Sequence, residues 1–266
     1  MTGLWDLNPA VPCVVALARP RRWLANSLAL TMAATVVAGC GTNDPRQTDT
    51  PEARERVQSH AVFRVTTGRP LVALTFDDGP DPRWTPAVLG LLSRRSGRAT
   101  FFLVGRNALA HPDLVRAELA AGDEIGNHTL THAHLEFLPP AGVQAEVAGG
   151  SRAIVAAGAP RPRLFRPPRG FTTKVVARAA ARAREQTVFW GVTVERFVGR
   201  RGAVADGVNR LLARMRPGTV VLAHDGGMDR SRTLQALPLL LDGLAARGYR
   251  LVTLSELLAS GHAATL

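Results

Sequence analysis

Short apolar runs alternate with helix-patterned segments through most of this chain, and that alternation restricts the folds open to it. Seven runs rich in β-branched and aromatic residues follow one another, at 71–76, 99–104, 123–127, 163–166, 187–192, 219–224 and 249–254. Strands that are separated by helices pair in parallel, because each helix returns the chain to the same end of the sheet. The pattern therefore predicts an α/β fold with about seven parallel strands. Seven units favour closure into a (β/α) barrel, although an open doubly wound sheet has the same local pattern.

The segments between these runs carry helix boundary signals. Pro86 and Pro112 each stand at a plausible first helical position, where a missing N–H costs nothing. Gly122 and Gly248 stand where a helix would end, because glycine readily adopts the left-handed conformation of a C-terminal cap. These signals support the strand and helix alternation.

Clusters of polar residues follow five of the apolar runs directly. They are Asp77-Asp78, His128 with His132, Arg166, Thr193 to Arg196, and His224-Asp225. In a parallel α/β fold the carboxyl ends of the strands lie on one face, where active sites are built. We therefore expect these clusters to meet in space.

Two of the clusters indicate a metal site. Asp77 and Asp78 are adjacent carboxylates, which repel each other unless a cation or a strong donor is present. His128 and His132 are four residues apart, so on a helical turn both imidazoles face the same way. Alone, that spacing also fits two surface or capping histidines. Together with a carboxylate it predicts a catalytic metal site with open positions for water, most often zinc.

Five short segments resemble a known family. "TFDDGP", "HTLTH", "FRPPRG", "FWGVTVERF" and "VVLAHD" occur in the order of the five motifs of the polysaccharide deacetylases, the NodB-homology carbohydrate esterases. The resemblance covers residues 70–257 and places the deacetylase domain at 71–260. It implies a distorted (β/α) barrel with seven strands, in agreement with the number of apolar runs. It also implies a metal-dependent hydrolase that removes N-acetyl groups from an amino-sugar polymer.

The resemblance implies roles for the first two motifs. Asp77 corresponds to the general base, while Asp78, His128 and His132 correspond to the ligands of one divalent ion. Zinc is the expected metal, with cobalt or another transition metal as alternatives. Arg166, in the third motif, would hold Asp77 through a charge-assisted pair.

The remaining matched positions concern the leaving group and the substrate cleft. His224 corresponds to the general acid that protonates the departing amine. Arg169 stands where the family usually has Tyr, and its backbone N–H would still help to hold the oxyanion. Trp190 and Leu222 are the other expected cleft residues.

The fourth motif departs from the family pattern of two Asp and a second Trp. The aligned residues are Thr193, Arg196 and Phe197, so the usual acidic partner of the catalytic His is absent. If the chain stays extended there, only one of Glu195 and Arg196 can point at His224. We expect Glu195 to be the substitute partner, because a carboxylate favours the imidazolium that a general acid requires.

The first seventy residues differ in composition from the rest. Arg21 and Arg22 precede an apolar stretch that ends at Cys40, in the form of a secretory signal over residues 1–39. Val37-Ala38-Gly39-Cys40 resembles the bacterial lipobox, in which the Cys is lipidated. An ordinary signal peptide with an accidental Cys is the alternative, and the export route, general secretory or twin-arginine, stays open. Residues 40–70 are polar and are expected to form a tether.

Net charge and composition restrict the partners. The formal net charge is +12, which favours anionic envelope polymers or lipid head groups. Nucleic acid is not expected, since the Arg residues form no dense run and aromatics make up only 5% of the chain. These features predict an exported deacetylase, lipid-anchored through Cys40, acting on peptidoglycan or a chitin-like glycan. A catalytically weak lipoprotein that binds glycan is the alternative, and a nuclease or phosphoesterase is a weaker third reading.

Overall fold

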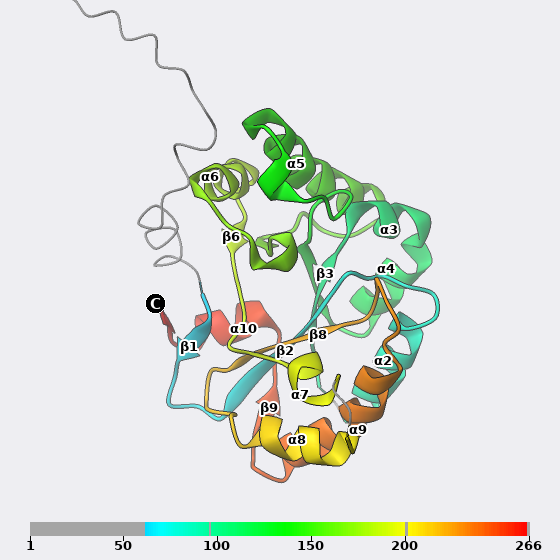
Figure 1. Ribbon diagram of the computed structural model, residues 1–266, viewed down its shortest axis with the longest axis vertical. Helices are drawn as coiled ribbons and strands as arrows, with labels where there is room; N and C mark the ends of the chain where they lie inside the picture. The colour runs from blue at the N-terminus through cyan, green and yellow to red at the C-terminus, as the bar shows by residue number, and fades with distance from the viewer. Residues whose placement is uncertain (1–61, 96, 200–201, 265–266) are drawn as a thin grey trace, which may run out of the picture. The chain divides into compact units, whose positions relative to one another are not determined.

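The computed structural model in Figure 1 describes residues 62–95, 97–199 and 202–264. These residues belong to one compact unit of the chain, 43–266. The expected signal segment, Cys40 and most of the expected tether lie outside the described residues. Within the part that is described, no helix combines the length and the apolar character needed to cross a membrane.

A parallel sheet forms the centre of the fold. Its strands are β2 (Leu71–Asp77), β3 (Thr100–Leu103), β4 (Glu124–Asn127), β5 (Leu164–Phe165), β6 (Gln186–Thr187), β7 (Val192–Thr193), β8 (Val220–His224) and β9 (Arg250–Leu251). Their order is β6-β5-β4-β3-β2-β8-β7, and β9 pairs with β2. β6 and β7 follow each other in the chain but occupy opposite ends of this order. The sheet is thus a distorted barrel left open between β6 and β7, which confirms the predicted fold class.

The run at 187–192 is not the single strand that we predicted. Thr187 pairs with β5, whereas Val192 pairs with β8 on the other side of the opening. The backbone between them divides its hydrogen bonds: Val188 N–H donates to the carbonyl of Phe165 in β5, Phe189 N–H to that of Val62, and Gly191 N–H to that of Val220 in β8. A segment that spans the opening cannot pair along its whole length with either side.

Helices surround the sheet. They are α2 (Thr85–Ser93), α3 (Gly105–Ala110), α4 (Pro112–Ala120), α5 (Pro140–Ala156), α6 (Lys174–Ala183), α7 (Val194–Val198), α8 (Val204–Leu212), α9 (Ser231–Ala245) and α10 (Leu254–Ala259). The expected boundary signals are present: Pro86 and Pro112 lie in first turns, and Gly122 and Gly248 have φ of 81° and 75°. The run at 249–254 forms only a short strand, because the capping box of Thr253 and Glu256 starts α10.

A small antiparallel sheet joins the two ends of the described chain. β1 (Arg64–Thr66) pairs with β10 (His262–Ala264), and Figure 1 shows the two strands beside α10. Val62 and Val65 are buried in the same apolar cluster as Leu71 and Val220. Residues 64–66 were expected within the polar tether, but these apolar side chains attach them to the domain.

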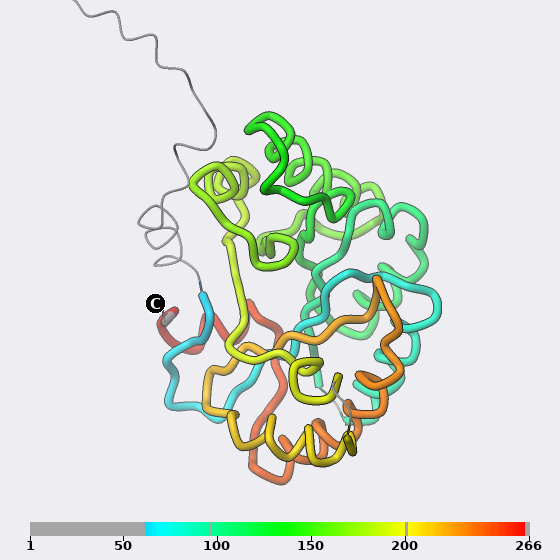
Figure 2. The backbone as a smooth tube through the Cα atoms, in the orientation of Figure 1, coloured from blue at the N-terminus to red at the C-terminus, as the bar shows by residue number. Residues whose placement is uncertain are grey.

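The strand register brings the predicted clusters to one edge of the sheet. Figure 2 shows β2 and β8 running side by side through the middle of the domain, and Asp77 lies level with His224. Asn127, just before His128, lies level with Phe165, just before Arg166. All the residues of β2 are buried, as expected for a parallel strand covered on both faces. A rigid central strand therefore carries the first carboxylate of the site.

Candidate active site and metal centre

Asp77 and Asp78 face different partners although they are adjacent. Asp77 ends β2 and is 3% exposed, and its Oδ1 accepts a hydrogen bond of 2.7 Å from Arg166 Nη1. Asp78 has a φ of 75°, which breaks the alternation of a strand. Asn107 fixes this unusual backbone by donating to the Asp78 carbonyl at 2.9 Å. Arg166 therefore binds only the first of the two carboxylates.

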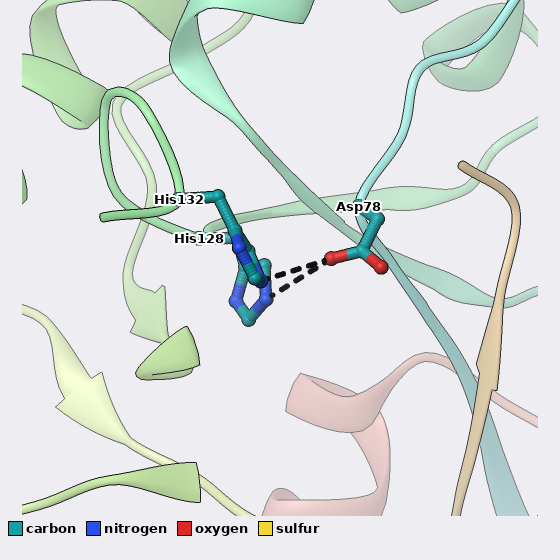
Figure 3. A group of neighbouring side chains, drawn as sticks. All are labelled: Asp78, His128 and His132. Carbon is teal, nitrogen blue, oxygen red and sulfur yellow. Dashed lines mark ion pairs between the residues drawn. The ribbon is translucent and has the colours of Figure 1, made fainter. Parts of the chain in front are cut away.

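Asp78, His128 and His132 form the candidate metal centre (Figure 3). Asp78 Oδ1 lies 3.2 Å from His132 Nε2 and 3.6 Å from His128 Nε2. The three ligand atoms lie within 4.8 Å of one another. His128 Nδ1 lies 2.7 Å from the carbonyl oxygen of Arg166, which can only accept, so Nδ1 carries the proton and Nε2 keeps a lone pair. Two imidazole nitrogens and one carboxylate oxygen fit zinc or a related divalent ion.

We had expected the two histidines to lie on a helical turn, and this prediction was wrong. The segment between them is a loop in which Thr129 and His132 have φ of 71° and 60°. Asn127 Oδ1 accepts from Thr129 N–H at 2.9 Å, and Thr129 Oγ1 accepts from His132 N–H at 3.1 Å. These side-chain bonds to the backbone turn the chain, so the imidazoles converge by a route that the spacing alone does not predict.

Arg166 is completely buried behind Asp77. Its guanidinium also donates to Thr75 Oγ1 at 2.8 Å and to the carbonyl of Phe189 at 2.9 Å, and it lies 4.1 Å from the ring centroid of Phe102. This set of contacts fixes the guanidinium, and the guanidinium in turn fixes one carboxylate oxygen of Asp77. Asp77 Oδ2 stays on the metal side, 3.8 Å from His128 Nε2.

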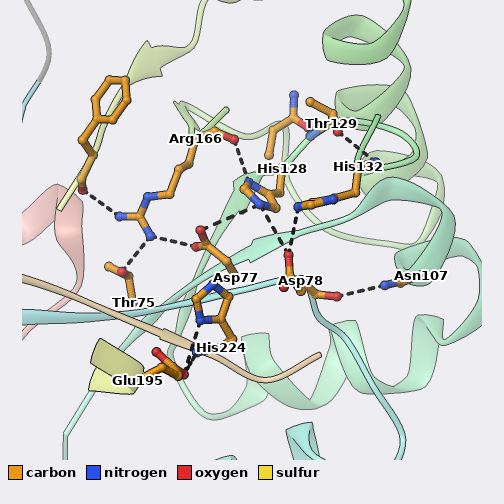
Figure 4. Close-up of polar contacts among 12 residues, drawn as sticks. Thr75, Asp77, Asp78, Asn107, His128, Thr129, His132, Arg166, Glu195 and His224 are labelled. Carbon is orange, nitrogen blue, oxygen red and sulfur yellow. Dashed lines mark hydrogen bonds and ion pairs between the residues drawn. The ribbon is translucent and has the colours of Figure 1, made fainter. Parts of the chain in front are cut away.

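His224 faces Glu195 across the site from the metal centre (Figure 4). The His224 Nδ1 atom lies 3.3 Å from Glu195 Oε1, which also accepts from His224 N–H at 3.1 Å and from Thr233 Oγ1 at 3.0 Å. Burial disfavours the imidazolium, but the carboxylate of Glu195 outweighs it, so the pKa of His224 is raised.

The chain does not stay extended through the fourth motif, the condition under which we considered Glu195 and Arg196. The strand β7 ends at Thr193, and the short helix α7 begins at Val194. Glu195 nevertheless points at His224, as we had expected on other grounds. Arg196, the next residue along α7, lines a different cavity. Successive side chains of a helix point about 100° apart, so this helix separates the two residues as a strand would.

All the predicted site residues of the domain except the buried Arg166 line one cavity of about 350 Å³. Its lining is Asp77, Asp78, His128, His132, Arg169, Trp190, Thr193, Glu195, Leu222, His224, Met228 and Arg230. The expected cleft residues Arg169, Trp190 and Leu222 are thus in place. The Arg169 side chain donates to the carbonyl of Ala133 at 3.1 Å, which ties the third motif to the loop after His132. A volume of this size suits a small group such as one sugar residue.

Sequence reasoning missed Arg230. It is 5% exposed, and its Nη2 donates to Asp78 Oδ2 at 3.1 Å while its Nε donates to the carbonyl of Gly226 at 2.6 Å. Burial raises the pKa of Asp78, but His128, with His224 and His132, outweighs it and lowers that pKa to about 2. Arg230 directly precedes α9, six residues after His224, and no spacing rule marks it.

Asp225 serves as neither an imidazole partner nor a helix cap. It is fully buried, and its Oδ2 accepts from Thr85 Oγ1 at 2.5 Å. Burial raises its pKa to about 7, and the nearby Asp78 adds to this shift. A Cβ on Gly79 would lie 2.5 Å from its oxygens, so the glycine of the first motif makes room for this carboxyl group.

Comparisons with known proteins agree with this geometry. Residues 64–188 match the family model described as polysaccharide deacetylase. A peptidoglycan-N-acetylglucosamine deacetylase of Bacillus cereus is 37% identical over 203 residues, which cover 76% of this chain and 95% of that protein. A chitooligosaccharide deacetylase of Bradyrhizobium is 39% identical over 204 residues, covering 72% and 92%.

Solved structures show the same fold. A family 4 carbohydrate esterase from Streptomyces lividans, in complex with acetate, has a TM-score of 0.65 and 32% identity, covering 75% of this chain and 99% of that chain. A pseudoenzyme of the same esterase family from Bacillus anthracis has a TM-score of 0.68 and 26% identity, covering 75% and 69%. With a fold, a motif order and relatives in common, this chain belongs to the polysaccharide deacetylase family.

Proposed function

We propose that this protein is a metal-dependent hydrolase that removes N-acetyl groups from amino-sugar residues of a glycan at the cell envelope. One observation carries the proposal: Asp77, held by Arg166, and His224, held by Glu195, line the same cavity as the Asp78, His128 and His132 triad. A deacetylase needs a base and an acid on either side of the scissile bond. The names of the relatives support peptidoglycan or a chitin-like polymer as the substrate.

Asp78, His128 and His132 would hold the ion. When bound, a divalent metal supplies a Lewis acid for the acetamide carbonyl and lowers the pKa of water. The tautomer of His128, set by the Arg166 carbonyl, leaves Nε2 free for this purpose. Arg230 donates to Oδ2 of Asp78, so the other oxygen, Oδ1, faces the histidines and is available to the ion.

Asp77 is the base in this proposal. Its Oδ1 is occupied by Arg166, whereas Oδ2 faces the centre and takes the proton from the attacking water. As the water oxygen bonds to the carbonyl carbon, negative charge develops on the carbonyl oxygen, for which the Arg169 N–H is the expected backbone donor. That N–H makes no hydrogen bond within the described residues, and Arg169 has a φ of 57°.

His224 completes the reaction as the acid. Its Nδ1 faces Glu195, so Nε2 can deliver a proton to the departing sugar nitrogen as the C–N bond breaks. The products are acetate and a free amine on the sugar. Glu195 keeps His224 charged at a pH where an unsupported histidine would have lost its proton.

Acetate release tests the proposal. The purified protein, loaded with zinc or cobalt, is incubated in parallel with peptidoglycan and with chito-oligosaccharides, and acetate is measured with and without a chelator. We expect release that stops on chelation and is absent in Asp77→Asn. Glycan binding without acetate release from either substrate would contradict the enzyme and support the weakly active glycan-binding alternative. The proposal also includes export and a lipid anchor on Cys40, and the sequence of the first forty residues supports both.

A further inference from the structure

A second cavity borders the proposed catalytic cavity. Its volume is about 690 Å³, roughly twice that of its neighbour, and it is lined by the segment 190–193, by Arg196 and Phe197 of α7, and by Arg210 and Arg214. Trp190 and Thr193 line both cavities. The two cavities therefore adjoin at these residues. Figure 1 shows α7 and α8 side by side, and these helices supply Arg196, Phe197 and Arg210 to the second lining.

The lining of this second cavity is strongly positive. It contains three arginines and no carboxylate. Arg210 lies in the last turn of α8 and Arg196 in the last turn of the short helix α7, where a cation is favourable to the helix dipole. Arg214 comes from the chain just after α8, so the three cations reach one cavity from separate places. Three like charges around one cavity repel one another unless an anion is bound.

These guanidinium groups also lack partners in the protein. Arg196, Arg210 and Arg214 form no side-chain hydrogen bond or ion pair with any residue that the structure describes. By contrast, Arg95 pairs with Asp242 at 2.6 Å. The donors around the cavity thus remain available to a ligand.

We propose that the second cavity binds a carboxylate-bearing sugar next to the one that is deacetylated. The inference rests on the proposed function and narrows its substrate class to an acidic glycan such as peptidoglycan. The peptide branches of that polymer carry carboxylates, and its lactyl ether carries one wherever the peptide has been removed. Arginine matches the planar geometry of a carboxylate with two parallel hydrogen bonds. Trp190 and Phe197 add aromatic faces on which the apolar side of a sugar can pack. A neutral chitin-like chain offers the arginines no anion.

The altered fourth motif fits this assignment. Arg196 and Phe197, two of its three departures from the family pattern, line the second cavity, and the third, Thr193, lies between the two cavities. Glu195 meanwhile takes the position opposite His224. The same short helix therefore supplies a partner to the proposed acid on one side and an anion site on the other.

Binding to the full-length protein without added metal tests the cavity apart from catalysis. The ligands are a peptidoglycan tetrasaccharide with its peptides, the same glycan freed of peptides, a fully amidated form and chitotetraose. We expect both carboxylate-bearing glycans to bind at least about tenfold more tightly than the amidated form and chitotetraose, with an advantage that shrinks in high salt. The Arg210→Gln/Arg214→Gln variant should lose most of that advantage.

A charge-matched control separates the site from the net charge. Arg116→Gln/Arg152→Gln removes the same two charges from exposed positions on α4 and α5, outside the lining. It should keep the preference for the acidic glycan. Equal loss of preference in both double variants, or equal affinity of the parent for amidated and native glycan, would overturn the proposal.

The kinetic arm keeps this proposal distinguishable from the proposed function. In the metal-loaded enzyme, Arg210→Gln/Arg214→Gln should lower kcat/KM for the acidic glycan about tenfold more than for chitotetraose, mainly through KM. Selective binding of the acidic glycan without acetate release would refute the deacetylase activity but support the carboxylate site in the second cavity. Acetate release with no preference for the acidic glycan over chitotetraose would refute the carboxylate site but support the deacetylase activity.

Discussion

At the scale of single residues, the structure distinguishes the proposed metal ligands from the proposed base. Asp78, His128 and His132 converge on one point, whereas Asp77 is bound by Arg166. Alanine at any of the three ligand positions should weaken zinc binding by more than the roughly 10–100-fold that loss of an outer partner costs. Asp77→Asn should retain the metal and lower kcat by about 10²–10⁴-fold.

Metal content and calorimetric titration with zinc measure this difference. His134→Ala is the matched control, because His134 is exposed beyond the same loop and pairs with Glu136. A parent protein that takes up no metal from zinc or cobalt medium would contradict the assignment. So would an Asp77→Asn variant that loses metal as completely as Asp78→Ala.

Glu195 carries the second residue-scale prediction. It raises the pKa of His224, and a general acid works only while it is protonated. Glu195→Gln should therefore move the alkaline limb of the kcat profile to lower pH and lower kcat on the order of tenfold. The pH profile on chitotetraose measures both effects, and Glu195→Asp should restore part of them. An unchanged alkaline limb with normal kcat would show that Glu195 does not support His224.

At the scale of elements, the sequence predicted the strands and the edge at which the site lies, because apolar runs and the residues after them are local signals. It did not predict the turn from His128 to His132. That turn depends on α5, since Glu146 accepts from Thr131 N–H at 2.9 Å and its carbonyl accepts from Leu130 N–H. The sequence also did not predict the break between β6 and β7, because that break depends on strands far away in the chain.

Helix α4 carries a prediction about stability. Both carboxylate oxygens of Glu118 are buried and have no hydrogen-bond partner among the residues described. Burial, with added repulsion from Asp225 and Asp123, raises its pKa well above 4.5. The unfolded chain releases this proton near the ordinary pKa while the folded chain keeps it. Stability therefore falls as the pH rises above that value.

Glu118→Gln removes this titration. Its melting temperature should exceed that of the parent by more at about pH 8 than at about pH 5, with about 2–4 °C for each kcal/mol. Thermal unfolding followed by circular dichroism at both pH values measures the gain. Asp113→Asn, at an exposed position of the same helix, is the control. A gain that is equal at the two pH values would mean that Glu118 does not titrate as proposed.

At the scale of the whole molecule, the net charge and the expected lipid anchor would both bring the protein to the cell envelope. The net charge of +12 favours contact with anionic polymers, but charge alone gives a reversible, salt-sensitive association. A lipid on Cys40 would add membrane attachment that salt does not reverse. The two contributions can therefore be separated by washing membranes in high salt.

Cys40→Ala tests the anchor. The prediction rests on Val37-Ala38-Gly39-Cys40 after an apolar stretch that Arg21 and Arg22 precede. In cells that express the full chain, the variant should leave the salt-washed membrane fraction, or remain unprocessed, and should no longer incorporate labelled fatty acid. Cys13→Ala is the matched control, because Cys13 lies upstream of the expected cleavage and should leave labelling intact. If Cys40→Ala fractionates, migrates and labels like the parent, Cys40 is not the attachment point.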